Sequence, residues 1–273
     1  MDRISVQEGE KKHMNKDKIY LSTIASDAPY YARKYGLGLE IAEFCTAWNM
    51  DRRFDLVDPR VKDSLQGISH SILHAPSNEL FPCAIDEKAR ELAVYRYRQA
   101  IALARRYGCK KVVIHGGYHP WMYYPVWYVG QSIAFWKEFL AEDPGVQIVL
   151  ENVLETQPDL ILDIVEGVDD PRFRMCLDVG HINAYSYVPI MDWLETCAPW
   201  TGHIHINNND GKEDQHKGLH DGNIPMKELL QRIESLCPDA TITLEMTETK
   251  SSIEWLMKER IWRFKDGFLK ECR

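Results

Sequence analysis

The chain has 273 residues, of which 45% are hydrophobic, so it is long enough and apolar enough to bury one large core. Its formal net charge of −8 argues against a general nucleic-acid binder, because such proteins usually carry a basic face. The sequence has no apolar run of the roughly 18 or more residues that a membrane-spanning helix needs, so we expect no membrane partner.

The chain begins with a charged segment, MDRISVQEGEKKHMNKD, that precedes the first apolar run. This segment has no apolar h-region and therefore does not match a secretory signal peptide. We expect a flexible leader over 1–17 and a single domain over 18–273. The seven cysteines include no CxxC pair, which predicts reduced thiols in a cytoplasmic protein.

Short apolar runs alternate with longer helical patterns along the rest of the chain. The clearest helical pattern covers 86–107, where small residues recur at helical spacing until Gly108. Further helices are predicted over 157–167, 189–199, 225–236 and 249–271. The apolar runs predict strands over 18–24, 38–44, 69–75, 110–116, 146–152, 172–178, 201–207 and 240–246.

This alternation predicts a (β/α)8 TIM barrel, which takes about 250 residues. The alternative is an open doubly wound sheet, whose first strand usually leads into a glycine-rich turn. The corresponding turn here, TIASDAPYY, contains no glycine. We therefore predict a barrel and expect its active site at the carboxyl ends of the strands.

Histidines and carboxylates stand where the predicted strands end. The sixth strand ends in Asp178, and His181 follows three residues later. The seventh strand carries His203 and His205, which point to the same side, so either could contribute. With His205 in that position, the candidate set is His74, His115, Glu151, Asp178, His181, His205, Asp214, His216 and Glu245.

Carboxylates at the mouth of a barrel need partner cations, because an unpaired buried charge costs several kcal/mol. No lysine or arginine lies at the ends of the strands that present Glu151 and Glu245. Metal ions would supply the missing charge, and imidazole and carboxylate ligands without thiolate suit Zn²⁺, Mn²⁺ or Fe²⁺. The set exceeds the needs of one ion, so we expect two or three ions that share a bridging carboxylate.

With these motifs the chain resembles the xylose isomerase-like barrel superfamily and, within it, endonuclease IV, the type 2 family of AP endonucleases. His205 is preferred to His203 because the HIN that it begins is similar to the H-x-N-D of that family. The resemblance implies three zinc groups, formed by His74, His115 and Glu151; by the bridging Glu151 with Asp178, His205 and Glu245; and by His181, Asp214 and His216.

Two enzymatic functions are compatible with this pattern. The main prediction is metal-assisted hydrolysis of a phosphoester, in an abasic-site nucleic acid or a small sugar phosphate; His74 and His115, which a one-metal isomerase does not need, favour it. The alternative is isomerisation or epimerisation of a sugar or sugar phosphate at one Mn²⁺ or Mg²⁺ ion, with Glu151 and Glu245 as acid and base. The acidic net charge and the loose match to the DNA-entering loops of endonuclease IV favour the alternative. A non-catalytic metal-binding barrel is the third class.

Candidate substrate contacts lie in the loops that follow the strands. The aromatic run HPWMYYPVWYVG, residues 119–130, is too long for a plain connection and predicts a lid that stacks on a sugar or base. A hydrophobic patch against neighbouring helices or a second copy is the other interpretation. Glu43 and Glu40 should face opposite sides of the second strand, with Glu43 nearer the mouth. The predicted contacts are Glu43, Trp48, Trp121, Tyr123 and Tyr124.

Overall fold

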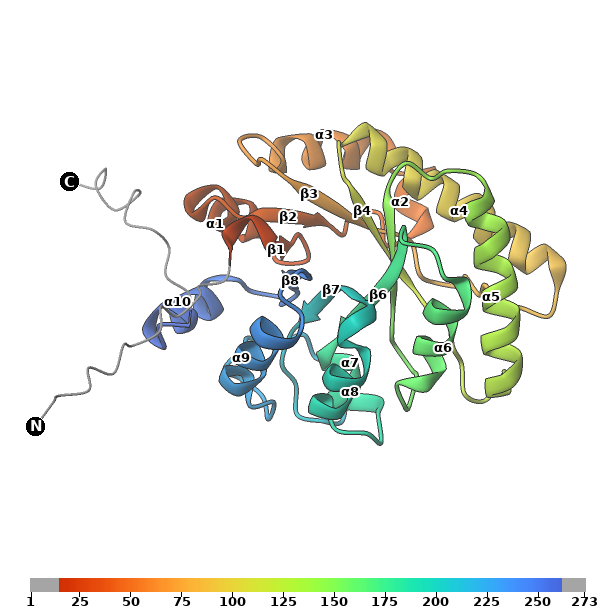
Figure 1. Ribbon diagram of the computed structural model, residues 1–273. Coiled ribbons are helices and arrows are strands. Elements are labelled where there is room, and N and C mark those ends of the chain that lie inside the picture. Colours follow the sequence, from red (N-terminus) through yellow and green to blue (C-terminus); the bar gives the residue numbers. More distant parts are fainter. Residues whose placement is uncertain (1–14, 262–273) are drawn as a thin grey trace, which may run out of the picture.

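Figure 1 shows the computed structural model, which describes residues 15–261. The strands pair in parallel in chain order, and the last pairs with the first to close a barrel, with the helices outside the ring of strands. The predicted (β/α)8 TIM barrel is therefore confirmed. The strands are β1 Ile19–Ser22, β2 Gly38–Ile41, β3 Ser71–His74, β4 Lys111–His115, β5 Gln147–Glu151, β6 Phe173–Asp178, β7 Thr201–Ile206 and β8 Thr241–Leu244.

The helices fill the connections between these strands. Those between β1 and β2, β2 and β3, and β4 and β5 were not among the predicted helical patterns. Proline explains part of this, because Pro59 lies inside one of these helices and Pro125 begins another within the aromatic run. The helices are α1 Ala28–Tyr35, α2 Ala47–Asp51, α3 Phe54–Ser64, α4 Glu87–Arg106, α5 Pro125–Ala141, α6 Asp159–Val168, α7 Val179–Tyr185, α8 Ile190–Cys197, α9 Met226–Leu236 and α10 Lys250–Lys258.

Helix α4 shows how a helix is attached to the barrel. Its buried residues include Ala93, Tyr97, Ala100 and Ala104, which share one face at a spacing of three or four. The alanines let the helix backbone approach β3 and β4 closely, and the Tyr97 ring stacks on Trp136 of α5 at 5.5 Å between centroids. The core between strands and helices therefore holds the strands in a fixed position.

The ends of the chain are described only in part. Most of the predicted leader 1–17 and the end of the predicted helix 249–271 lie outside the described residues; Lys16–Lys18 is a short 3-10 helix, and α10 ends at Lys258. The cysteines within residues 15–261 are all free. No helix in that part of the chain is long and apolar enough to cross a bilayer.

The register of the barrel sets which side chains meet at its mouth. His115 pairs with Glu151 across β4 and β5, and Asp178 pairs with His205 across β6 and β7. His205 in turn pairs with Thr243 of β8. Because paired residues of parallel strands lie at one level, the predicted strand-end residues form a layer across the carboxyl end of the barrel.

Candidate metal centre

The structure brings the predicted ligands together in three adjacent groups. Within each group, one potential ligand atom per residue lies within 4.8 Å of the others. The groups are His74, His115 and Glu151; Glu151, Asp178, His205 and Glu245; and His181, Asp214 and His216. They match the three groups implied by the family resemblance, and their role as metal ligands stays a prediction.

The first group places two imidazoles against one carboxylate oxygen. Glu151 Oε2 is 3.3 Å from His74 Nε2 and 3.3 Å from His115 Nε2. His74 Nδ1 lies 2.9 Å from the carbonyl oxygen of Ala75 and must donate to it, so in a neutral ring Nε2 carries a lone pair. Two ligands of a tetrahedral zinc ion lie about 3.3 Å apart when each is about 2.0–2.1 Å from the metal. The separations therefore fit a shared cation.

The central group is built around His205 Nδ1. This nitrogen is 3.1 Å from Glu151 Oε1 and 3.1 Å from Glu245 Oε2, and 3.7 Å from Asp178 Oδ2. Glu151 thus turns one oxygen toward the first group and the other toward the central group. This is the geometry that a bridging carboxylate requires.

The third group lies in the loop after β7. Asp214 Oδ2 is 3.2 Å from His181 Nε2 and 2.9 Å from His216 Nε2. The Nδ1 atom of His181 donates to the carbonyl of Asn152, and that of His216 donates to the carbonyl of Glu245, each at 2.9 Å. His216 adopts a φ of +45°, which is strained for a residue with a side chain and is typical of functional sites.

The spacing of Asp178 and His181 has a structural explanation. Asp178 is the N-cap of α7, and its Oδ1 accepts a hydrogen bond of 2.7 Å from the backbone N–H of His181. Asp178 Oδ2 has no hydrogen-bond partner among the described residues and faces the central group. Asn152, which sequence reasoning missed, joins β5 to β6 by bonds of 2.9 and 3.1 Å to the backbone of Asp178.

The carboxylates and imidazoles in the layer of strand-end residues shift one another's pKa values. Burial raises the pKa of Asp178 to about 7, with a further contribution from Glu151 and Glu245. Burial also opposes ionisation of Glu151, but the facing His205 holds its pKa well below the ordinary value. Burial lowers the pKa of His115 to about 4, so that imidazole is neutral at physiological pH. Burial opposes protonation of His74 and His205, but the surrounding carboxylates raise the pKa of His74 to about 9 and that of His205 well above its ordinary value. The carboxylates of this layer therefore demand positive charge, and a divalent cation that replaces these protons fits the donor set.

Glu40 and Glu43 lie in different environments, and Glu40 is the one that contacts a predicted ligand. Glu43 is half-buried in the loop after β2, and its Oε2 accepts a 2.6 Å hydrogen bond from Thr23 Oγ1. Glu40 is fully buried inside the barrel, with Oε2 at 3.1 Å from His205 Nε2. Sequence reasoning did not select Glu40, although strand alternation placed it on the side opposite to Glu43.

His203 and His205 both point into the barrel, and the structure separates their roles. His203 lies one level below, between the hydroxyls of Thr241 at 2.6 Å and Thr243 at 2.9 Å. His205 is the one that faces the carboxylates of the central group. The geometry thus agrees with the preference for His205.

The predicted aromatic contacts fall into two classes. Trp48, Trp121 and Tyr124 are exposed on loops and a short helix on the carboxyl side of the barrel, and Trp121 is 91% exposed. Tyr123 instead lies in the hydrophobic core, with its ring centroid 6.0 Å from that of Phe81. The ring of Tyr123 is thus used in packing, and its contact with substrate stays a prediction.

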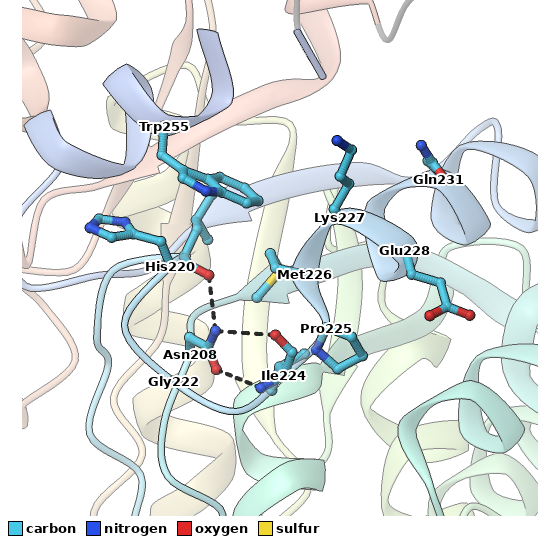
Figure 2. Close-up of a pocket in the computed structure, with 11 residues that line it drawn as sticks. Asn208, His220, Gly222, Ile224, Pro225, Met226, Lys227, Glu228, Gln231 and Trp255 are labelled. Atoms are coloured by element: carbon cyan, nitrogen blue, oxygen red, sulfur yellow. Dashed lines mark hydrogen bonds between the residues drawn. The ribbon is translucent and has the colours of Figure 1, made fainter. Parts of the chain in front are cut away.

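A pocket of about 480 Å³ lies beside the centre, between the loop after β7, the start of α9 and Trp255 of α10 (Figure 2). Asn208 ties its wall together by donating to the carbonyls of Leu219, at 2.9 Å, and Ile224, at 3.4 Å. None of the clustered histidines and carboxylates lines it. The pocket is therefore separate from the candidate metal centre.

The family model described as xylose isomerase-like TIM barrel matches residues 34–261. This chain belongs to the xylose isomerase-like TIM barrel family. An uncharacterized protein of Methanocaldococcus jannaschii, MJ1311, is 29% identical to it over an alignment of 194 residues that covers 67% of this chain and 66% of that protein. The chain thus spans just under two thirds of the length of this relative.

Solved structures share the fold of this xylose isomerase-like barrel. A D-tagatose 3-epimerase-like protein is similar with a TM-score of 0.69 and 23% identity, over 88% of this chain and 96% of that chain. The IolI protein, in a crystal structure with a bound zinc atom, is similar with a TM-score of 0.67 and 16% identity, over 89% of this chain and 93% of that chain. At these identities the similarity establishes the common architecture.

Proposed function

We propose that this xylose isomerase-like barrel is a divalent-metal-dependent enzyme that isomerises or epimerises a small sugar or sugar phosphate. The observation that carries the proposal is the convergence of Glu151, Asp178, His205 and Glu245 on one buried point at the barrel mouth. These donors suffice for one divalent ion. The names of the similar structures, one epimerase-like and one zinc-bound, support the proposal and favour it over phosphoester hydrolysis.

The two glutamates would move the proton. A bound divalent ion would polarise the carbonyl of the sugar and acidify the neighbouring C–H bond. Glu151, which its imidazole neighbours keep ionised, takes the proton from that carbon. In an epimerisation, Glu245 would return a proton to the other face of the same carbon. In an isomerisation, it would return a proton to the adjacent carbon, while the proton of the neighbouring hydroxyl moves to the former carbonyl oxygen. His181 and His216 would then bind hydroxyl groups of the sugar.

The exposed aromatic side chains would form the wall around the substrate. Trp48, Trp121 and Tyr124 offer apolar faces of the kind that stack on sugar rings, and they lie on the side of the barrel where the strands end. Glu43 would contact a sugar hydroxyl beside Thr23. Substitution of Trp121 should therefore raise KM more than it lowers kcat.

Phosphoester hydrolysis remains the second candidate because of a specific observation. The groups around His115 and around Asp214 offer two further sets of ligands that a one-ion isomerase does not use. With all three groups filled, closely spaced cations would activate a water and bind the phosphate. An abasic-site nucleic acid or a small sugar phosphate would then be the substrate.

Deuterium exchange separates these reactions. We would incubate the protein with Mn²⁺ or Zn²⁺ and a panel of ketoses and ketose phosphates in D₂O, and follow the sugar by NMR. An isomerase or epimerase should form a second sugar that carries deuterium at the reacting carbon, and Glu245→Gln should abolish this exchange. Release of phosphate, or cleavage of an abasic duplex, without any exchange would overturn the proposal in favour of hydrolysis.

A further inference from the structure

Glu40 lies on the opposite edge of the His205 ring from the metal centre. Glu40 Oε2 is 3.1 Å from His205 Nε2, whereas His205 Nδ1 faces Glu151 and Glu245. A neutral imidazole carries one proton, so the nitrogen that donates leaves the other free to bind a metal. The partner of Nε2 therefore determines whether Nδ1 can be a ligand.

The hydrogen bonds to Glu40 come from a buried chain beneath the centre. Thr243 Oγ1 donates to Glu40 Oε2 at 2.5 Å. Since that hydroxyl has a single proton, it must accept at its 2.9 Å contact with His203 Nε2. His203 therefore carries its proton on Nε2, and the short contact of its Nδ1 with a threonine hydroxyl is then one in which Nδ1 accepts.

The remaining hydrogen bonds of this buried chain also donate toward Glu40. The Thr241 hydroxyl has two possible acceptors, His203 Nδ1 at 2.6 Å and the carbonyl oxygen of Gly202 at 3.3 Å, and the nearer one takes its proton. The same oxygen accepts from Lys111 Nζ at 2.5 Å. Lys111 also donates to the carbonyl of Gly202 at 2.6 Å. Each donor along this chain points toward Glu40, so the Glu40 carboxylate accepts from the chain on one side and is left to accept from His205 on the other.

We propose that Glu40 is a positioning residue that holds the proton of His205 on Nε2 and thereby frees Nδ1 to bind the metal. Glu40 also lies in a group with His74, His205 and Glu245 whose potential ligand atoms are within 4.8 Å of one another. In the arrangement proposed here it acts through His205 and not as a ligand. The inference rests on the proposed function to the extent that a metal binds. Which of the two His205 nitrogens carries a proton, and whether both do, is however measurable without metal.

The test uses three variants of the full chain. Glu40→Ala removes the acceptor, Glu40→Gln keeps an acceptor oxygen but removes the charge, and Thr243→Val removes one donor to Glu40 at similar volume. Zinc affinity would be measured by competition with a chromophoric chelator, and the tautomer of His205 by nitrogen-15 NMR of the metal-free protein. Asp58→Asn is the matched control, because Asp58 is a buried carboxylate paired with Arg106 and Lys62, between α3 and α4.

We expect a graded response. Glu40→Ala should weaken zinc binding about 10- to 100-fold, the range seen when the carboxylate behind a metal-binding histidine is lost, and should move the proton of His205 to Nδ1. Glu40→Gln should keep the proton on Nε2 and lose less affinity, and Thr243→Val should have the smallest effect. Asp58→Asn should lower the unfolding temperature without changing zinc affinity or tautomer.

The failure of this inference can be told apart from failure of the proposed function. If the wild-type chain binds no metal, the proposed function fails, and the tautomer in Glu40→Ala still decides the role of Glu40. If Glu40→Ala binds zinc as tightly as the wild type and keeps the proton of His205 on Nε2, Glu40 is not a positioning residue. An anomalous map with an ion bonded directly to Glu40 would also overturn the inference. If Glu40→Ala does not fold, zinc affinity and the His205 proton position in Glu40→Gln and Thr243→Val are compared with the wild type instead.

Discussion

The interior of the barrel holds two polar layers, each of which contains histidine but which differ in the groups that surround it. In the lower layer, His203 lies between the hydroxyls of Thr241 and Thr243, and Lys111 donates to Thr241 and to a carbonyl. In the mouth layer, lone pairs of imidazoles and carboxylates face each other, and Glu151 Oε2 and Asp178 Oδ2 have no hydrogen-bond partner among the described residues. Threonine hydroxyls satisfy the histidine of the lower layer, whereas the mouth layer leaves carboxylate oxygens without hydrogen-bond partners and so suits a cation.

The two histidines of β7, His203 and His205, show the same difference within one strand. They are two residues apart on β7, point into the same barrel and are both fully buried. Their neighbours differ, because β8 offers Thr241 at one level, while the ends of β5 and β8 bring carboxylates to the next. A histidine in this fold is therefore a structural residue or a candidate ligand according to whether hydroxyls or carboxylates surround it.

The largest expected effect comes from removing the carboxylate shared by two groups of the mouth layer. Glu151→Gln should lower kcat for proton exchange at the sugar carbon by about 10²- to 10⁴-fold, because a proton-transfer group is lost. It should also reduce the metal bound per chain, as measured by elemental analysis. Activity within a factor of two of the wild type would show that the mouth layer is not the catalytic site.

The pH dependence of the free energy of unfolding tests the role of Lys111 in the lower layer. Burial lowers the pKa of Lys111 to about 8, below its value of roughly 10.4 in an unfolded chain, so the unfolded state binds more protons between these values. The contribution of Lys111 to stability should therefore rise as the pH increases from about 8 to about 10.4, by at most about 3 kcal/mol. Urea unfolding of the wild type and of Lys111→Met at pH 7 and pH 10 measures it. A difference between the two that does not change with pH would contradict the prediction.

Removing metal should destabilise the mouth layer and spare the lower one. A metal at 100 times its dissociation constant stabilises a folded protein by about 2.7 kcal/mol, so treatment with a chelator should lower the unfolding temperature by roughly 5–10 °C for a chain of this size. Calorimetry with and without added Zn²⁺ or Mn²⁺ checks this. The shift should be the same in Lys111→Met, and an unfolding temperature indifferent to metal would argue against any bound cation.

The smallest effect is expected for His115→Ala, which distinguishes the proposed function from its alternative. If one ion at the central group suffices, this variant should keep sugar exchange within about tenfold of the wild type, since the group that moves the proton is intact. A multinuclear hydrolase should instead lose nearly all phosphoester cleavage. Assays of both reactions, with metal content measured on the same samples, decide between them.

The barrel fold and the residue types at its mouth could be predicted from the sequence. Each predicted strand contains a strand of the structure, because apolar runs of this length between helical patterns have few other solutions. His74, Glu151 and Asp178 were recognised because each ends an apolar run, where a polar residue is conspicuous. Glu40 was not selected because it lies inside a strand, three residues before a more exposed glutamate, and the burial of Tyr123 was not foreseen because its aromatic neighbours are exposed.

The sequence by itself determined that this chain would form an eight-stranded barrel with acids and imidazoles at the strand ends, since local periodicity and residue type are properties of short segments. Only the tertiary structure decided which nitrogen of His205 faces Glu40, that His203 is satisfied by threonines and that Glu151 turns an oxygen to each of two groups. The reason is physical. A hydrogen bond has a direction that depends on both partners, and in this barrel the partners come from strands far apart in the chain.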